Sequence, residues 1–181
     1  MKKDVSIEYL STILKLNENT GVLTWRSRPR EHFKNQQVFV GWNTRYADKT
    51  AGYERPDGYR IVRFDGQRFL YHRIVYAIHH GMNIQDLPRF IDHIDNNQRN
   101  NIPANLRPAE HAQNLYNISA HIDNTSGFKG VSWEARYKHW EARIRANGQR
   151  YHLGYFDSPE DAHAAYAAAA NDLHGEFART A

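Results

Sequence analysis

The chain has 181 residues, of which 40% are hydrophobic and 13% aromatic, so it can bury a core and is not expected to be disordered. Cysteine is absent, which excludes disulfide frameworks, thiolate zinc sites and cysteine nucleophiles. The net charge of +4 agrees with a nucleic-acid partner without requiring one. No apolar run approaches the roughly 18 residues of a membrane span, and the first ten residues lack the apolar segment of a signal peptide. We therefore expect no membrane association.

The basic charge is unevenly distributed along the chain. Residues 1–123 hold 17 basic and 13 acidic side chains, whereas residues 124–181 hold 7 of each. Between these parts, residues 118–127 are polar and turn-forming. We therefore predict two domains, 1–123 and 124–181, and any DNA contact by the second must depend on how its charges are arranged.

The N-terminal region predicts a helix followed by a strand. Apolar residues recur at helical spacing within residues 4–16, and residues 21–25 read as a strand. The next stretch, 26–34, is rich in arginine and is interrupted by Pro29. Two interpretations stay open for it: a flexible arm on the phosphate backbone, or a solvated loop.

Residues 36–70 predict short strands joined by tight turns. Asp57-Gly58 and Asp65-Gly66 each separate strand-like runs, and Asp-Gly in that setting is a strong hairpin signal. Residues 72–80 then show the apolar spacing of a helix, with Gly81 as its expected end.

The stretch 90–117 concentrates polar residues in a strand–loop–helix pattern. An apolar strand ends in Asp92 and His93, a loop rich in Asn and Asp follows, and a second short strand leads to Pro108. Proline is pre-set for the first position of a helix, so we expect a helix over residues 110–117.

This pattern is typical of metal-assisted phosphodiester hydrolysis. A hard cation such as Mg²⁺ prefers oxygen ligands, which Asp92 can supply as a carboxylate and Asn114 as an amide. Because successive side chains of a strand point to opposite faces, His93 can stand away from the metal. An imidazole that titrates near neutral pH suits a general base acting on water.

The ordered set of residues resembles the HNH motif of phage and intron-encoded homing endonucleases. The elements that match are Asp92-His93, Asn100-Asn101, Asn105-Leu106-Arg107, Asn114 and, upstream, His72-Arg73-Ile74-Val75. The resemblance covers roughly residues 20–120 and implies a ββα-metal fold. It implies that Asp92 and Asn114 hold the metal, that His93 is the base and that Asn105 braces the loop that positions His93.

The C-terminal part predicts three strands and one helix. The strands are expected at 128–134, 140–146 and 149–156, and the helix from Ser158 to His174. Asn147-Gly148 is a hairpin turn signal, and Ser158-Pro159 combines an N-cap with a first-turn proline. The alternation of Trp140, Ala142 and Ile144 places one sheet face against the alanine-rich helix.

The other face of this sheet is expected to present basic side chains. It carries Arg143 and Arg145, joined by Arg150 and His152 from the neighbouring strand. An antiparallel sheet with such a face can lie in the major groove. The alternative is a solvated face of mixed charge, and Glu141 on the same face favours that alternative.

This module also resembles the AP2 DNA-binding domain. The matching segments are Gly127–Trp133, Trp140–Arg145, His152–Asp157 and the alanine helix. The resemblance implies DNA contacts by Lys129, Ser132, Arg143, Arg145, Arg150 and His152. Ser132 and Glu134 stand where the plant pattern has arginine, so affinity and specificity would differ from that pattern.

We therefore expect an α+β protein that pairs a ββα-metal nuclease with an AP2-like three-stranded sheet on one helix. It should nick double-stranded DNA with one divalent cation per site, Mg²⁺ or alternatively Mn²⁺, in the cytoplasm of a phage-infected bacterium. No protein partner is evident, and a monomer is expected, with a dimer as the alternative. The rival function is a DNA-binding regulator with a decayed nuclease site, which the intact Asp92, His93 and Asn114 disfavour.

Overall fold

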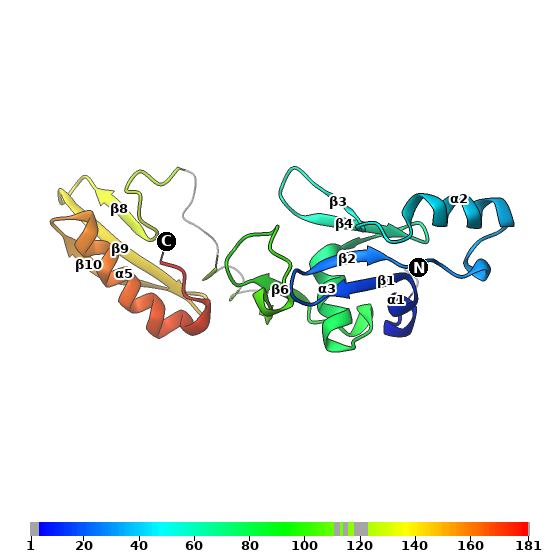
Figure 1. The fold of residues 1–181 in the computed structure, drawn as a ribbon. Coiled ribbons are helices and arrows are strands. Elements are labelled where there is room, and N and C mark those ends of the chain that lie inside the picture. Colours follow the sequence, from blue (N-terminus) through cyan, green and yellow to red (C-terminus); the bar gives the residue numbers. More distant parts are fainter. Residues whose placement is uncertain (1–3, 111–112, 114–115, 118–122, 181) are drawn as a thin grey trace. The chain divides into compact units, whose positions relative to one another are not determined.

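The computed structural model describes residues 4–110, 113, 116–117 and 123–180, and the chain divides into two compact units, Met1–Pro108 and Ala109–Ala181 (Figure 1). This division lies N-terminal to the predicted boundary after residue 123. Tyr116 thus falls in the second unit, where its ring stacks on His174 with centroids 3.8 Å apart. Among the described residues, no helix is both long and apolar enough to cross a membrane.

The first unit combines three helices with three small sheets. Its helices are α1 (Ile7–Ile13), α2 (Gln36–Tyr46) and α3 (Tyr71–His80). Its strands are β1 (Leu14–Asn17), β2 (Val22–Trp25), β3 (Tyr53–Glu54), β4 (Arg60–Phe64), β5 (Gln67–Leu70), β6 (Phe90–His93) and β7 (Leu106–Ala109), the last ending one residue past Pro108. The strands pair as β1–β2, β3–β4–β5 and β6–β7.

Helix α3 supplies the centre of this unit's core. Ile74 and Val75 are fully buried, and burying a side chain of this size contributes about 1.5–3 kcal/mol. The Tyr71 hydroxyl accepts a hydrogen bond of 2.5 Å from the backbone N–H of Leu23 and so joins α3 to β2. The helix ends as predicted at Gly81, whose positive φ of 65° suits glycine.

Three sequence-based expectations for this unit are wrong. Residues 36–46 form helix α2 and not strands, because the Asn35 side chain caps the helix by accepting from the Val38 N–H. The first helix stops at Ile13, since β1 pairs with β2 from there on. Pro108 lies inside β7, so it does not open the following helix; the described residues Gln113 and Tyr116 are helical.

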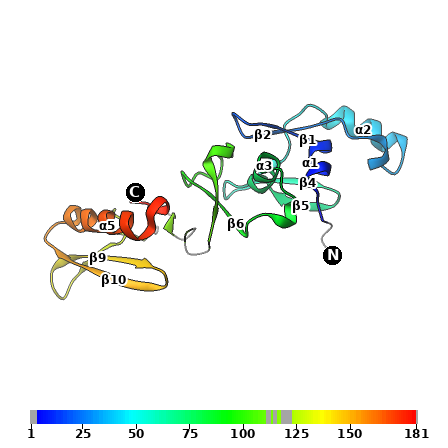
Figure 2. The ribbon, with the colours of Figure 1, turned by 90° about the horizontal axis from the view of Figure 1, so that it is seen from below.

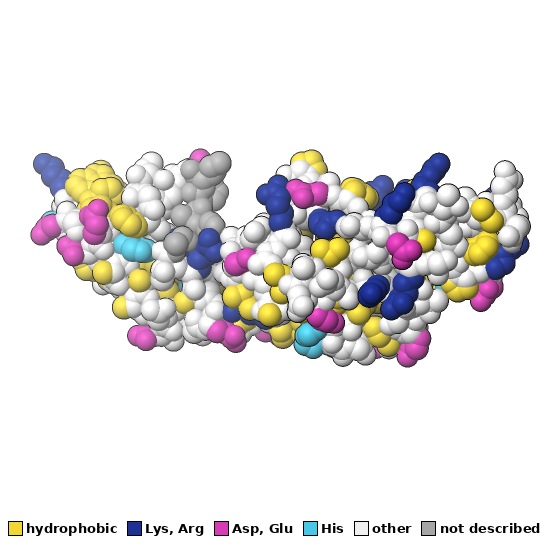
Figure 3. Space-filling view, viewed as in Figure 1, with side chains coloured by type: hydrophobic (Ala, Val, Ile, Leu, Met, Phe, Trp, Pro, Cys, Tyr) yellow, Lys and Arg dark blue, Asp and Glu magenta, His cyan; other side chains and the backbone are white. Residues whose placement is uncertain are grey.

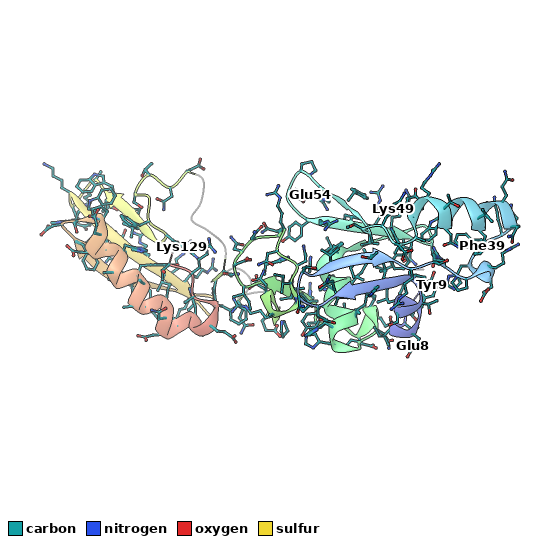
Figure 4. The ribbon with its side chains drawn as sticks, in the orientation of Figure 1. Glu8, Tyr9, Phe39, Lys49, Glu54 and Lys129 are labelled. Carbon is teal, nitrogen blue, oxygen red and sulfur yellow. The ribbon has the colours of Figure 1, made fainter. Side chains whose placement is uncertain are left out.

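The basic stretch 26–34 is neither a flexible arm nor a solvated loop at its centre. Arg28 is buried, and its guanidinium donates to Asp65 Oδ1 (2.9 Å) and to the Tyr9 hydroxyl (2.8 Å). The Tyr9 hydroxyl in turn donates to the Asp65 carboxylate. Tyr9 lies on α1 (Figure 4), so this network ties the basic stretch to the first helix and to the β4–β5 turn.

The second unit is a three-stranded antiparallel sheet with one helix. Its strands, in spatial order β10 (Gln149–Phe156), β9 (His139–Ala146) and β8 (Val131–Glu134), are covered on one face by α5 (Pro159–His174) (Figures 1 and 2). Ser158 caps α5 by accepting from the Asp161 N–H at 3.1 Å. Between sheet and helix, Ala142 and Ala162 are fully buried. The predicted three-strand and helix pattern is therefore present.

The first strand of this sheet starts at Val131, later than expected, because a turn at Gly130 precedes it. Gly130 has a φ of +73°, and a Cβ there would lie 2.2 Å from the Tyr166 ring of α5. The chain thus passes too close to the helix at this point for any other residue.

Candidate active site

Asp92 and His93 end strand β6, where the pairing with β7 holds both side chains inside the first unit. They are 6% and 4% exposed, respectively. Successive side chains along a strand point to opposite faces, so the carboxylate and the imidazole face different surroundings. This adjacency at the end of a strand is what the sequence predicted.

The carboxylate of Asp92 faces Arg107 on β7. Asp92 Oδ2 accepts from Arg107 Nη2 at 3.0 Å and from Nε at 3.2 Å, and both side chains are buried. The sequence pointed to Arg107 only as part of a motif and not to this pair. The two residues are 15 positions apart, so no local periodicity could have signalled it.

The imidazole of His93 lies among aromatic rings and one amide. Its Nε2 is 3.3 Å from Asn101 Oδ1, and the rings of His72 and Tyr59 pack edge-on with centroids 5.0 and 6.1 Å away. Burial lowers the pKa of His93, an effect partly opposed by Asn101 and by the nearby Asp95. The imidazole is therefore neutral at pH 7 and able to accept a proton.

His72, which precedes the motif in the sequence, is a packed residue behind His93. It is 5% exposed, and burial lowers its pKa to about 3. It therefore stays uncharged at neutral pH and supports the position of the His93 ring through the ring contact.

The loop after His93 is braced by Asn105. The Asn105 amide nitrogen donates to Asp95 Oδ1 (2.9 Å) and to the Asn100 carbonyl (2.8 Å), and its oxygen accepts from the Asp95 N–H (3.1 Å). Arg99 in the same loop pairs with Glu54 at 2.8 Å; Glu54 lies on β3 (Figure 4). These contacts close the loop on itself and attach it to the neighbouring sheet.

The far end of the loop touches the β1–β2 turn. Gly21 in that turn has a φ of +67°, and a Cβ on it would lie 2.1 Å from the Asn101 carbonyl oxygen. The backbone of Asn101 is therefore packed directly against this turn. Gly21 was not predicted from the sequence to belong to the site.

Of the two residues expected to hold the metal, Asp92 and Asn114, the structure describes Asp92. Asp92 provides an oxygen donor, and its donor chemistry fits a hard divalent cation. Asn114, the second expected ligand, lies outside the described residues. Within the described ranges, no group of three His, Asp or Glu side chains could hold a metal ion, so a site in this part of the chain would need an amide or water to complete it.

In the first unit, the arginines of the β4–β5 hairpin divide between core and surface. Arg60 turns inward: it donates to the Ala51 carbonyl at 3.3 Å, and its guanidinium lies over the Tyr71 ring. Arg63 and Arg68 are paired across the hairpin and are exposed. Lys and Arg side chains are also visible over the surface of this unit (Figure 3).

In the second unit, five of the six predicted DNA-contact residues share one sheet face. The register places Arg145 opposite Arg150 and Arg143 opposite His152, with Ser132 opposite Glu141. Residues directly opposite each other in a pair of strands project to the same side. This is the face turned away from α5.

Glu141 on this face is not a solvated charge. It is 3% exposed, and its carboxylate accepts from Arg143 Nε and Nη2 (both 2.5 Å) and from His152 Nδ1 (2.8 Å). Glu141 therefore orders the Arg143 and His152 side chains beside it, and no sequence pattern indicated that Glu141 would be buried. The ring of Tyr155, 43% exposed, packs on His152 at the same face.

Lys129 lies apart from that face, in the segment before β8 (Figure 4). Its ammonium donates to the Tyr116 carbonyl at 2.6 Å, and burial lowers the pKa of Lys129 to about 8. This hydrogen bond joins the segment before β8 to the backbone at Tyr116 within the second unit. Two aromatic side chains that were not predicted as site residues, Trp133 on β8 and Tyr137 in the β8–β9 turn, are exposed. Hydrophobic side chains are also visible on the surface of this unit (Figure 3).

Comparison with known proteins matches residues 69–116 to the family described as HNH endonuclease. The chain is 37% identical over 90 residues to Protein 3.8 of Escherichia phage T7, across 50% of this chain and 74% of that protein. It is 35% identical over 118 residues to the uncharacterized HNH endonuclease L560 of Acanthamoeba polyphaga mimivirus, across 65% of this chain and 59% of that protein. No solved structure matches the chain.

Proposed function

This chain belongs to the HNH endonuclease family and is a nuclease, and on that basis we propose that it nicks double-stranded DNA with the help of a divalent cation. The observation that carries the proposal is the Asp92–His93 pair at the end of β6. It combines a buried carboxylate with an adjacent imidazole that burial keeps neutral.

In the proposed reaction, His93 takes a proton from the water that attacks the scissile phosphate. A neutral imidazole is the form that can do this, and a positioned general base contributes about 10²- to 10⁴-fold. Asn105 keeps the loop closed so that His93 stays in place. Arg107 holds the Asp92 carboxylate in one orientation.

Asp92 and Asn114 would hold the cation, which we propose to be Mg²⁺, with Mn²⁺ as an alternative. When bound, the cation neutralises charge on the phosphate and on the leaving 3′ oxygen. One active site cuts one strand, so a monomer should nick, and a double-strand break would need a dimer or two separate events.

The second unit is proposed to bind the duplex through its AP2-like sheet. The basic face of β9 and β10, with Arg143, Arg145, Arg150 and His152, supports this, since cationic groups arranged on one face can contact successive phosphates. The exposed Arg63 and Arg68 offer a further basic surface in the nuclease unit. Both relatives are viral proteins, which supports action in an infected cell as a homing endonuclease.

A plasmid-relaxation assay tests this function. Supercoiled DNA from a candidate host should convert to open circle with Mg²⁺ or Mn²⁺, and not with EDTA. His93→Ala should reduce nicking at least about 100-fold while DNA binding stays unchanged. His79→Ala is the matched control, because His79 is an exposed histidine on α3 paired with Glu18.

Nicking that persists in EDTA, or a His93→Ala protein that nicks as fast as the wild type, would contradict the proposal. Direct linearisation without an open-circle intermediate would contradict the single-strand mechanism and indicate paired active sites.

A further inference from the structure

One pocket of the first unit is lined mainly by aromatic rings. Its volume is about 430 Å³, within the range of pockets that hold small molecules. Asp92 and His93 do not line it, so it is separate from the candidate active site. Its lining comes from β2, α2, β3, β4 and the segment before β3: Trp25, Trp42, Tyr46, Thr50, Gly52, Tyr53 and Arg63.

The rings of this aromatic pocket form a connected wall. Trp42 contacts Trp25 edge-on with centroids 5.3 Å apart, and the Tyr46 ring lies 5.2 Å from the Trp42 ring. Trp25 is buried, whereas Tyr46 and Tyr53 are exposed. A flat ligand placed in the pocket would therefore cover ring surface that now faces water, which is favourable.

Paired backbone holds the pocket open in advance of any ligand. The N–H of Trp25 donates to the Lys49 carbonyl at 2.9 Å, and the N–H of Asp48 donates to the Trp25 carbonyl at 2.8 Å. Gly52 follows with a φ of +80°, and a Cβ there would lie 2.6 Å from the Ile61 carbonyl oxygen. The segment between α2 and β3 is thus fixed against β2 and β4 and shapes one side of the pocket.

The charge around the pocket is positive. Arg63 is the charged residue among the described lining residues, and Arg45 and Lys49 beside the pocket are exposed as well. Within the part of the chain that the structure describes, none of these three cations forms an ion pair, whereas the nearby Glu54 is paired with Arg99. Lys and Arg side chains are visible between the β3–β4 hairpin and α2 in Figure 3, and Figure 4 labels Lys49. The pocket therefore suits a flat aromatic group that carries negative charge nearby.

The β3–β4 hairpin connects this pocket to the candidate active site. Tyr53 lies opposite Ile61, so the two side chains project to the same side of the sheet. Tyr59 and Arg63, each two residues from Ile61, share that side. The Tyr59 ring packs on His93 with centroids 6.1 Å apart. Two strand residues span roughly 7 Å, which is about two steps along a DNA strand.

DNA joins flat bases to phosphates, and HNH nucleases act on DNA. We propose that the aromatic pocket binds one base turned out of the duplex near the cleavage site, while Arg63 contacts a neighbouring phosphate. This inference rests on the proposed function, because it takes DNA as the ligand. Turning a base out costs least where the base is already unpaired, and stacking on aromatic side chains offsets that cost for any base.

Binding of two related duplexes tests the proposal. One short duplex is fully paired, and the other has the same sequence with one additional, unpaired adenine. Fluorescence anisotropy of the full-length protein in EDTA, which prevents cleavage, should show that the wild type binds the second duplex at least about 5-fold more tightly. Tyr53→Ala should abolish this preference, whereas Tyr53→Phe keeps the ring and should retain it. Tyr137→Ala is the matched control, because Tyr137 is 50% exposed, as Tyr53 is, but lies in the second unit.

Two further measurements assign the contacts within the pocket. With 2-aminopurine in place of the unpaired adenine, stacking on the rings should quench its fluorescence with the wild type and much less with Tyr53→Ala. Arg63→Ala should weaken binding of both duplexes alike and lower the salt slope by about 0.9, the value for one phosphate contact. Circular dichroism verifies that each variant is folded.

A wild type that binds both duplexes equally would overturn the inference, and so would a Tyr53→Ala protein that keeps both the preference and the quenching. If Tyr53→Ala instead loses self-association with its preference unchanged, the pocket binds a second copy of the chain and the inference is wrong. A wild type that binds neither duplex would contradict the proposed function together with this inference. Equal binding to both contradicts the inference alone.

Discussion

Replacing Arg107 with methionine should lower the free energy of unfolding of the first unit by about 3–5 kcal/mol at pH 7. Arg107 donates two hydrogen bonds, of 3.0 and 3.2 Å, to one oxygen of Asp92, and both side chains are buried. A hydrogen bond to a charged group contributes about 1.5–3 kcal/mol. Removing one partner of a buried ion pair costs about 3–5 kcal/mol, which agrees with two such bonds.

The double variant Asp92→Asn with Arg107→Met removes the charge as well as its partner. It should be more stable than Arg107→Met alone, because replacing both members of a buried pair is often close to neutral. The exposed Arg68 provides the matched control, and Arg68→Met should change stability by no more than about 0.5 kcal/mol.

Urea unfolding followed by circular dichroism measures the total loss, and amide hydrogen exchange on β6 and β7 reports the loss locally. The reasoning is refuted if Arg107→Met costs less than about 1 kcal/mol, or if the double variant is no more stable than the single one. Either result would mean that the Asp92–Arg107 pair is exposed to water in solution, or that other groups take the place of Arg107.

Three further predictions concern other parts of the chain. Since burial lowers the His72 pKa from 6.5 to about 3, the unfolded chain binds a proton there at pH values where the folded chain does not. Stability should therefore fall by up to about 1.4 kcal/mol per pH unit on acidification from 6.5 towards 3, and urea titrations should show a shallower fall in His72→Gln. Arg143→Ala with Arg145→Ala should weaken DNA binding and reduce the salt slope by roughly 0.9 for each phosphate that the protein no longer neutralises; an unchanged slope in a salt titration would remove that face from the interface. Gly21→Ala should displace Asn101 and slow nicking, because the new Cβ would sit 2.1 Å from its carbonyl oxygen; wild-type kinetics would show that the turn moves freely.

Local patterns in the sequence predicted those parts of the fold in which neighbouring residues decide the conformation. Helix α3 followed from apolar spacing with glycine at its end, and the β9–β10 hairpin from Asn147-Gly148, whose φ angles of 50° and 79° suit such a turn. The Asp92–His93 pair was found in the same way, since its position at the end of a strand is a local property.

Other expectations were wrong because contacts from elsewhere in the chain prevailed. The segment of helix α2 was predicted to form strands, although Asn35 before it is a typical N-cap residue. Leu14 was predicted to be helical, but it lies in β1 because it pairs with Trp25 of β2. Pro108 can open a helix by its own preference, but here the pairing of β6 with β7 places it in a strand.

The same distinction between local patterns and long-range contacts applies to the candidate active site. Residue types and their order in the sequence pointed to Asp92 and His93, and the resemblance to the HNH motif added Asn105; the catalytic roles of all three stay predictions. The Arg107–Asp92 pair and the Asn101–His93 hydrogen bond depend on burial and on the close approach of separate segments. Burial of this kind is a property of the packed chain, since desolvation and hydrogen-bond direction arise only when distant residues enclose a group.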